Sequence, residues 1–418
     1  MKNQPITPTN RLTTKTNNQL FAIYTHFVLA DDWSLDGHLK YHIANTHYES
    51  DNVNAQNGSQ SLIDNAFDFR LKAENRWGVW DAKIHYEILA LYGDTPEIQL
   101  ADKAGTLKDE RRLFKLTDKW GNSDKLDAVQ RLDRFYLGYN GEQLVIRFGR
   151  QTVSWGNGLI FHPLDIFSPF SPVDIDKDYK TGDDMLYGQW LFENDDDLQM
   201  ILLPRRHPKS NRIESEQSSL AFKYHGRYQD EWDFDLAFAR HFDENVLGFG
   251  LSRDVFEAIW RFDITATRLK EGNTVVSLIT NMDYSWVWFE RNFYGYLEYF
   301  RNGVGETEAD RYLYPESALQ TRLERGEVYT RGKDYLGTGI QIELTPLFNF
   351  YTSSIVNLHD KSGFFQIRGI YDLAEDLQLI AWLDVPYGEK GSEFGGIPVD
   401  DKYIAPGQRA YLRVTYYF

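Results

Sequence analysis

The feature that most constrains this chain is an alternation of apolar and polar side chains that recurs along the sequence. Successive side chains of a β-strand point to opposite faces, so each such segment has one apolar and one polar face. The segments are about ten residues long, which is the length at which a tilted strand crosses a membrane. The alternation predicts membrane-crossing strands and is clearest in segments 35–43, 67–77, 80–92 and 409–418.

The C-terminal segment shows the two rows well. Leu412 and Val414 lie on one row, whereas Arg413 and Thr415 lie on the other. An arginine in the middle of a membrane-crossing strand requires water or an acidic partner, which lipid does not supply. We therefore expect the polar rows to face an enclosed aqueous lumen and the apolar rows to face hydrocarbon.

The same pattern continues through the second half of the chain, and we expect roughly 16 to 18 strands. The fold class predicted is all-β: a transmembrane, antiparallel, up-and-down β-barrel with an in-folded loop. Segment 242–254 is compatible with one turn or with an additional short strand. Further strand candidates are 232–238, 256–264, 293–301, 336–344, 348–356, 365–371 and 377–385, and long connections are expected at 49–63, 93–130, 152–182, 302–333 and 387–408.

A soluble antiparallel sandwich also alternates, so other properties have to separate the two architectures. The polar rows carry full charges of both signs, as a hydrated lumen would. Aromatic residues make up 15% of the chain although its mean hydropathy is −0.52, and they crowd strand ends as interfacial girdles do. Short turns alternate with long polar connections. These properties favour the membrane barrel.

Composition also excludes several classes of protein. The chain has no cysteine, which excludes disulfide scaffolds, zinc ribbons and thiol enzymes. Its net charge of −17 argues against nucleic acid as a partner. No apolar run approaches the roughly 20 residues of a transmembrane helix. Residues 1–19 form a polar N-terminal segment without the features of a signal peptide, and 20–418 are expected to form one barrel domain.

The connection 152–182 is the candidate functional segment. It is rich in proline, which is excluded from central strands, and in aromatic residues that are costly to expose to water. A loop that packs these residues inside the barrel would narrow the pore, whereas the plain alternative is a surface loop with a small hydrophobic cluster. The residues expected at the constriction are Trp155, Phe161, Phe167 and Phe170.

Acidic residues follow these aromatics. The spacing of Asp174, Asp176 and Asp178 is that of the start of a calcium loop, but Tyr179 stands where that loop needs glycine and Met185 where it needs an acid. We therefore expect no metal site. The acids are expected instead to cap turns or to pair with lumen arginines. The candidate arginines on inward rows or beside the loop are Arg147, Arg150, Arg261 and Arg413.

Two stretches carry a resemblance to known families. The ending 411–418 resembles the C-terminal assembly signal of bacterial outer-membrane proteins, which implies recognition by the barrel-assembly machinery through Tyr416 and Phe418. The Gly-Arg-Gln sequence at 149–151, followed by Ser-Trp-Gly at 154–156, resembles an element of porin-like barrels, including alginate-export-type proteins. In such barrels the following segment often folds into the lumen, so the resemblance implies a transport role.

The expected function is an outer-membrane channel of a Gram-negative bacterium that moves small solutes, with membrane lipid and lipopolysaccharide as its surroundings. The alternatives are transport of hydrophobic molecules or lipids, and a surface adhesive or structural barrel. No cofactor is expected, and no catalytic motif is present that would indicate an enzyme. The sequence leaves open the transported solute and the choice between monomer and trimer.

Overall fold

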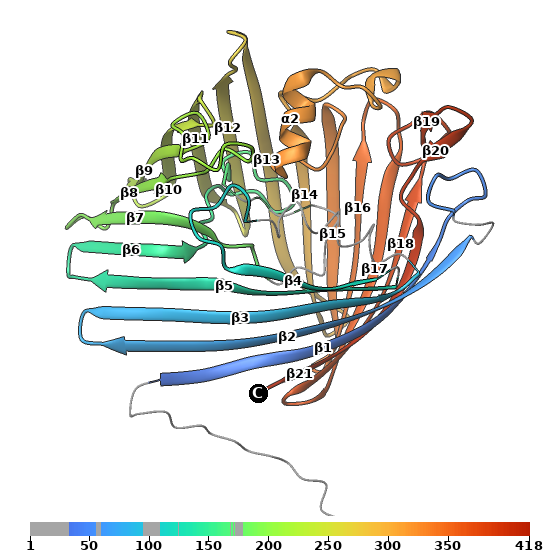
Figure 1. Cartoon of the computed structure of the whole chain (residues 1–418), viewed down its shortest axis with the longest axis horizontal. Helices are drawn as coiled ribbons and strands as arrows, with labels where there is room; N and C mark the ends of the chain where they lie inside the picture. Colours follow the sequence, from blue (N-terminus) through green and yellow to red (C-terminus); the bar gives the residue numbers. More distant parts are fainter. Residues whose placement is uncertain are drawn as a thin grey trace, which may run out of the picture.

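The computed structural model describes residues 33–55, 60–94, 109–123, 125–167, 169, 171 and 179–418. Within these residues the chain forms one sheet of nineteen antiparallel strands and a small two-stranded sheet (Figure 1). The first half of the large sheet contains β1 Trp33–His47, β2 Ser61–Trp77, β3 Trp80–Gly93, β4 Thr117–Ser123, β5 Leu126–Asn140, β6 Leu144–Gln151, β7 Asp183–Leu191, β8 Asp197–Leu203, β9 Ser219–Tyr228 and β10 Trp232–His241.

The second half continues in the same up-and-down order. Two short helical segments, η2 Ala309–Arg311 and α2 Ser317–Arg325, precede β15, and the small sheet precedes the last strand. The elements are β11 Glu244–Val255, β12 Ala258–Arg268, β13 Thr274–Trp288, β14 Arg291–Arg301, β15 Asp334–Thr345, β16 Phe348–Asn357, β17 Gly363–Ala374, β18 Leu377–Tyr387, β19 Ile397–Val399, β20 Lys402–Ile404 and β21 Gln408–Tyr417.

The large sheet closes on itself. β21 pairs with β18 on one side and with β1 on the other, and the register runs from His38 opposite Tyr417 to His47 opposite Gln408. β4 pairs only with β5, so eighteen of the nineteen strands form the ring. The prediction of a closed transmembrane-type barrel with 16 to 18 strands is confirmed. In Figure 1, β1 to β7 run nearly horizontally and β14 to β18 nearly vertically.

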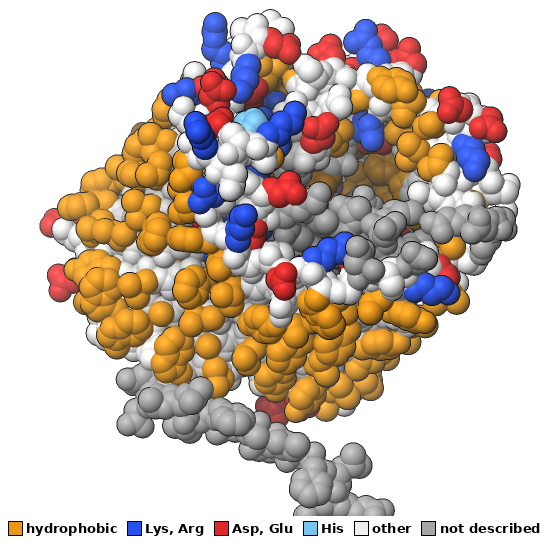
Figure 2. Space-filling view, in the orientation of Figure 1, with side chains coloured by type: hydrophobic (Ala, Val, Ile, Leu, Met, Phe, Trp, Pro, Cys, Tyr) orange, Lys and Arg blue, Asp and Glu red, His pale blue; other side chains and the backbone are white. Residues whose placement is uncertain are grey.

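Burial follows the alternation of the sequence. In β1, His38, Lys40 and His42 are buried in the barrel interior, whereas Leu39 and Tyr41 are exposed on its outer face. A shift of register by one residue would exchange these two faces, so the charged row fixes the pairing. Figure 2 shows the result as a broad hydrophobic belt on the visible outer face, with charged side chains gathered along the upper edge.

The two rims of the barrel differ. On one rim, which we call the short-turn rim, every connection is short, and the ends of β1 and β21 lie there with Phe418. On the other, the long-loop rim, connections include 48–60, 94–116, 152–182, 204–218, 302–333 and 388–407. Phe418 completes the closure, since its backbone exchanges hydrogen bonds with Gly37 at 2.9 and 3.2 Å. In the described part of the chain, no helix is sufficiently long and apolar to cross a membrane.

Several strand predictions need correction. Segment 242–254 contains a full strand, β11, which follows a two-residue turn at Phe242 and Asp243. The predicted connection 93–130 contains β4 and the start of β5. Phe256 begins no strand but occupies a tight turn, where φ is 57° and its ring is fully exposed. Short strands such as β8 lack a long alternating run, and the sequence pattern alone did not single them out.

Candidate functional site

The connection between β6 and β7, which we call the inner loop (residues 152–182), lies against the inner wall of the barrel. Its first part packs on β7 to β11 through Trp155, whose side chain is 3% exposed. The indole ring meets Phe167 edge to face at 5.3 Å, and its N–H donates a hydrogen bond to the Gln199 side chain at 2.9 Å. Burial of two aromatic rings together with a satisfied indole N–H makes this an ordered attachment.

The backbone of the inner loop is held by a carboxylate on β12. Asp263 is completely buried and accepts hydrogen bonds from the backbone N–H of Asn157 at 2.6 Å and from its side-chain amide at 2.8 Å. Asn281 on β13 donates a hydrogen bond to the Asn157 carbonyl at 3.0 Å. Both polar groups of the Asn157 peptide are therefore paired with the barrel wall.

A second carboxylate, on β14, holds the next residues. Glu298 is completely buried and accepts hydrogen bonds from the backbone N–H groups of Leu159, Ile160 and Phe161 at 2.7, 3.1 and 2.7 Å. The Asn281 side chain donates a fourth hydrogen bond at 3.0 Å. Four donors surround one anion, which compensates for the desolvation of its charge.

Aromatic packing completes this attachment. The Phe161 ring stacks on Phe300 of β14 with centroids 4.3 Å apart and lies 5.6 Å from the ring of Tyr335 on β15. At Gly337, a Cβ atom would meet the terminal methyl group of Ile160, so the loop side chain packs closely on β15 at this glycine. Residues 155–161, which we call the outgoing flank, are thus fixed to the β7–β15 side of the barrel.

The end of the inner loop contacts a distant part of the wall. The Tyr179 ring lies parallel to the His38 ring of β1 with centroids 6.0 Å apart, and the Arg70 guanidinium of β2 lies 4.5 Å from its centroid. In the closed ring, β1 and β2 are separated from β14 and β15 by β16, β17, β18 and β21 on one side and by more strands on the other. The described parts of the inner loop therefore contact two distant parts of the inner wall, at Phe161 and at Tyr179.

Residues 179–184, the return flank, are held by side chains of β5 and β6. The Arg134 guanidinium donates a hydrogen bond to the Lys180 carbonyl at 2.8 Å. The Gly182 N–H donates to Asp133 at 3.2 Å. Asp133 also accepts a hydrogen bond from Arg70 at 2.9 Å, so the attachment continues into the charged network of the wall.

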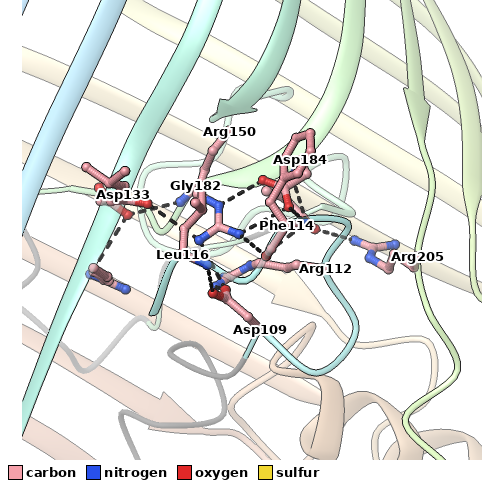
Figure 3. A network of polar contacts seen from close by, with 12 residues as sticks. Asp109, Arg112, Phe114, Leu116, Asp133, Arg150, Gly182, Asp184 and Arg205 are labelled. Atoms are coloured by element: carbon pink, nitrogen blue, oxygen red, sulfur yellow. Dashed lines mark hydrogen bonds and ion pairs between the residues drawn. The ribbon is translucent and has the colours of Figure 1, made fainter. Parts of the chain in front are cut away.

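The centre of this attachment is Arg150 (Figure 3). Its guanidinium is 1% exposed and pairs with Asp184 at 2.8 Å and with Asp109 at 3.1 Å. It also donates to the carbonyl of Phe114 at 2.8 Å, while the Phe114 N–H donates to Asp184 at 2.7 Å. Segment 109–116 thus forms a second piece of chain fixed inside the barrel mouth, and Arg150 joins it to the return flank.

This environment shifts the pKa values of several titratable groups in the loops. Although burial opposes it, the hydrogen bond from Arg112 and the charge of Arg150 lower the pKa of Asp109. Burial lowers the pKa of Lys180 to about 8, while its contact with Asp165 favours the charged form. Burial, together with the charge of Lys180, lowers the pKa of His162 to about 4, so this imidazole is neutral at pH 7.

The predicted site residues fall into three groups. Arg150, Trp155, Phe161 and Phe167 hold the inner loop in place. On the inner wall are Arg147, which lies 5.7 Å from the Tyr136 ring centroid, Arg261, which pairs with Asp283, and the buried Arg413 of β21. Phe170, Asp174, Asp176, Asp178 and segment 1–19 lie outside the described residues, so the narrowing of the pore by these side chains stays a prediction.

Tyr416 and Phe418, the residues of the predicted assembly signal, lie at the end of β21, beside the closure of the barrel, and their role stays a prediction. The sequence argument missed Glu298, Tyr179 and segment 109–116 as site elements. A signal for Glu298 exists, since alternation in 293–301 places it on the row opposite to Leu297, which is exposed on the outside. No sequence signal pairs Tyr179 with β1 and β2, because that contact depends on how the loop crosses the interior.

Comparisons with known proteins support the fold. No protein-family model matches the sequence, and no curated protein matches it significantly. Among solved structures, OccAB2 of Acinetobacter baumannii is 12% identical with a TM-score of 0.54, covering 92% of this chain and 98% of that one. A BenF-like porin from Pseudomonas fluorescens is 9% identical with a TM-score of 0.54, covering 93% and 99%.

A third similar structure is Wzi of Escherichia coli, a carbohydrate-binding β-barrel of the outer membrane that is involved in capsule assembly. It is 8% identical with a TM-score of 0.53, covering 92% of this chain and 84% of that one. At these identities the likeness concerns the barrel architecture.

Proposed function

We propose that this chain is a channel of the bacterial outer membrane that passes small hydrophilic solutes through a lumen narrowed by the inner loop. The observation that carries the proposal is the attachment of one loop to two separated parts of the wall, at Phe161 and at Tyr179. A loop held in this way restricts the passage without filling the whole barrel. The barrel architecture shared with a BenF-like porin is compatible with a channel.

The chemistry of the inner wall supports a hydrophilic solute. Arg70 pairs with Glu87 at 2.5 Å and with Asp133 at 2.9 Å, and Arg131 pairs with the same Glu87. Such rows of paired charges attract water and orient polar solutes during passage. A path for lipids would instead need continuous apolar side chains.

The rims suggest an orientation in the membrane. We place the short-turn rim, with the chain end at Phe418, on the periplasmic side, and the long-loop rim toward lipopolysaccharide at the cell surface. In this orientation β21, with Tyr416 and Phe418 on its outer row, is available to the barrel-assembly machinery before the barrel closes on β1.

The test compares purified wild-type protein with a variant in which residues 157–162 are replaced by glycine and serine. The replacement removes the side chains of Asn157, Ile160 and Phe161 that help to hold the outgoing flank on the wall, so single-channel conductance in planar bilayers should rise at least about twofold. A matched replacement of the exposed residues 207–212 should leave conductance unchanged. Absence of conductance and of liposome swelling in both forms would contradict the channel. Loss of flux of a hydrophobic molecule on replacing 157–162 would favour the lipid alternative.

A further inference from the structure

A cavity lies behind the inner loop, away from the side of the loop that faces Tyr179. It is bounded by loop residues 161–169, by the inner face of β10 to β14 and by residues 327–330, and it holds about 830 Å³ of empty space including its opening. Half of its lining is apolar. The apolar side chains include Phe161, Ile166, Val246, Val275, Phe300 and Val304.

The charged groups of this cavity are already paired with one another. Glu244 pairs with Arg322 at 2.6 Å, and Glu327 pairs with Arg325 at 3.5 Å and with His241 at 3.3 Å. The third carboxylate, Asp165, contacts Lys180. Each of the three acids therefore has at least one basic partner, and a charged ligand would have to be desolvated without gaining a free counter-charge.

A neighbouring pocket has more arginine side chains in its lining. It holds about 1160 Å³ of empty space including its opening and is lined by Arg111, Arg112, Arg205 and Arg325 among others. Three of these guanidinium groups surround the ring of Phe242. The two pockets share Ile166, His241 and Glu327, so the paired side chains of His241 and Glu327 lie between the neighbouring pocket, whose lining includes four arginines, and the first cavity, whose lining includes one.

The first cavity also contains one polar side chain that is available to a ligand. His162 lines it, and among the residues that the structure describes no hydrogen bond engages its imidazole ring. Because the ring is neutral at pH 7, it can donate or accept one hydrogen bond. Apolar walls with a single directed polar group are typical of sites for small molecules.

We propose that this cavity binds a small, neutral, amphipathic molecule, with an apolar ring or short alkyl chain against Phe161, Phe300 and Val246 and a hydroxyl or carbonyl group hydrogen-bonded to His162. The proposal goes beyond the proposed channel activity, on which it does not depend. Because Phe161 belongs both to the cavity and to the outgoing flank, an occupant would contact the same segment that Glu298 holds.

The test uses three fluorinated probes of equal size that differ in charge: 4-fluorobenzyl alcohol, 4-fluorobenzoate and 4-fluorobenzylammonium. Binding to the full-length protein in detergent is followed by fluorine NMR. We expect 4-fluorobenzyl alcohol to bind at least tenfold more tightly than either charged probe. Equal binding of the three probes, or tighter binding of a charged one, would overturn the assignment.

Variants locate the site. Thr267→Phe adds a ring inside the cavity and should weaken binding of the alcohol at least tenfold, whereas Ser353→Phe adds the same ring to the wall at β16 and should leave it unchanged. If Thr267→Phe loses the heat-modifiable gel mobility of a folded barrel, Val275→Phe replaces it, since Val275 pairs with Thr267 across the same cavity wall. If a folded variant with the added ring binds 4-fluorobenzyl alcohol as tightly as wild type does, the proposed site is refuted.

The role of His162 is tested separately. His162→Leu should weaken binding of 4-fluorobenzyl alcohol about fivefold but leave binding of 4-fluorotoluene, which has no hydroxyl group, unchanged. An equal loss for both probes would indicate only a change of shape and would refute the proposed hydrogen bond. Channel conductance of the same variants reports on the passage of solutes, so failure of the channel and failure of this site give different results.

Discussion

The outgoing and return flanks attach one loop to two parts of the same barrel with different chemistry. On the outgoing flank, Asp263 and Glu298 of the wall accept hydrogen bonds from backbone N–H groups of the loop. On the return flank, Arg134 of the wall binds the Lys180 carbonyl group of the loop, and Arg150 binds Asp184 where β7 begins. Backbone N–H groups are present for any loop sequence except at proline, whereas the return flank also depends on the side chains of Tyr179 and Asp184. The outgoing flank should therefore tolerate changes in loop side chains better than the return flank.

The largest effect is expected from Arg150→Ala, which breaks the return flank. It leaves Asp184 buried without its ion-pair partner and Asp109 with Arg112 alone, and removal of one partner from a buried ion pair costs about 3–5 kcal/mol. Thermal unfolding in detergent should show a lowered midpoint.

The matched control for that change is Arg227→Ala, because Arg227 forms an exposed ion pair with Asp233. Its loss should change the free energy of unfolding by less than about 1 kcal/mol. Equal effects of the two substitutions would show that Arg150 does not hold the return flank.

A smaller effect is expected from Glu298→Ala on the outgoing flank. It leaves three backbone N–H groups without their acceptor, at a cost of about 2–3 kcal/mol, after which the loop can leave the wall. We expect the open-channel current to become larger and noisier in bilayers. Glu343→Ala, near the short-turn rim, removes a half-buried carboxylate that accepts a hydrogen bond from Asn292 of the wall, and it should keep the wild-type current.

The dependence of stability on pH should distinguish the two flanks further. The pKa of Asp109 is lowered in the folded protein, so its contribution to stability is complete above its usual pKa near 3.8 and is lost as the pH falls below that value. Asp109→Asn should therefore be less stable than wild type at pH 6, with a difference that shrinks toward pH 3. Unfolding midpoints measured across this range provide the test, and a difference that grows on acidification would contradict the assigned pairing.

The smallest effect is expected from Tyr179→Ala. It removes the contact of the ring with Arg70 at 4.5 Å, which is worth about 0.5–1 kcal/mol at a partly exposed site. Tyr179→Phe keeps the ring and removes only the hydroxyl group that contacts Lys72, so it should lie closer to wild type than Tyr179→Ala. If both variants lose the same stability, the hydroxyl group and not the ring makes the contact.

The sequence by itself determined the barrel. In β1 and β21, alternation separates Lys40 and Arg413 from Tyr41 and Leu412, and burial in the structure follows that separation. Such a pattern is local, because it requires only that successive side chains of a strand point to opposite faces. The prolines and aromatic residues after Gln151 likewise indicated a connection between strands that packs its own aromatic side chains.

Only the tertiary structure determined which residues of the barrel interior contact the inner loop. Glu298 is one of many inward acids in the sequence, and its role arises because β14 brings it beneath three N–H groups that are more than a hundred residues away along the chain. Tyr179 and His38 meet only once the ring closes. Contacts across a closed barrel depend on strand number and on the path of the loop, and neither is encoded in the period of a single strand.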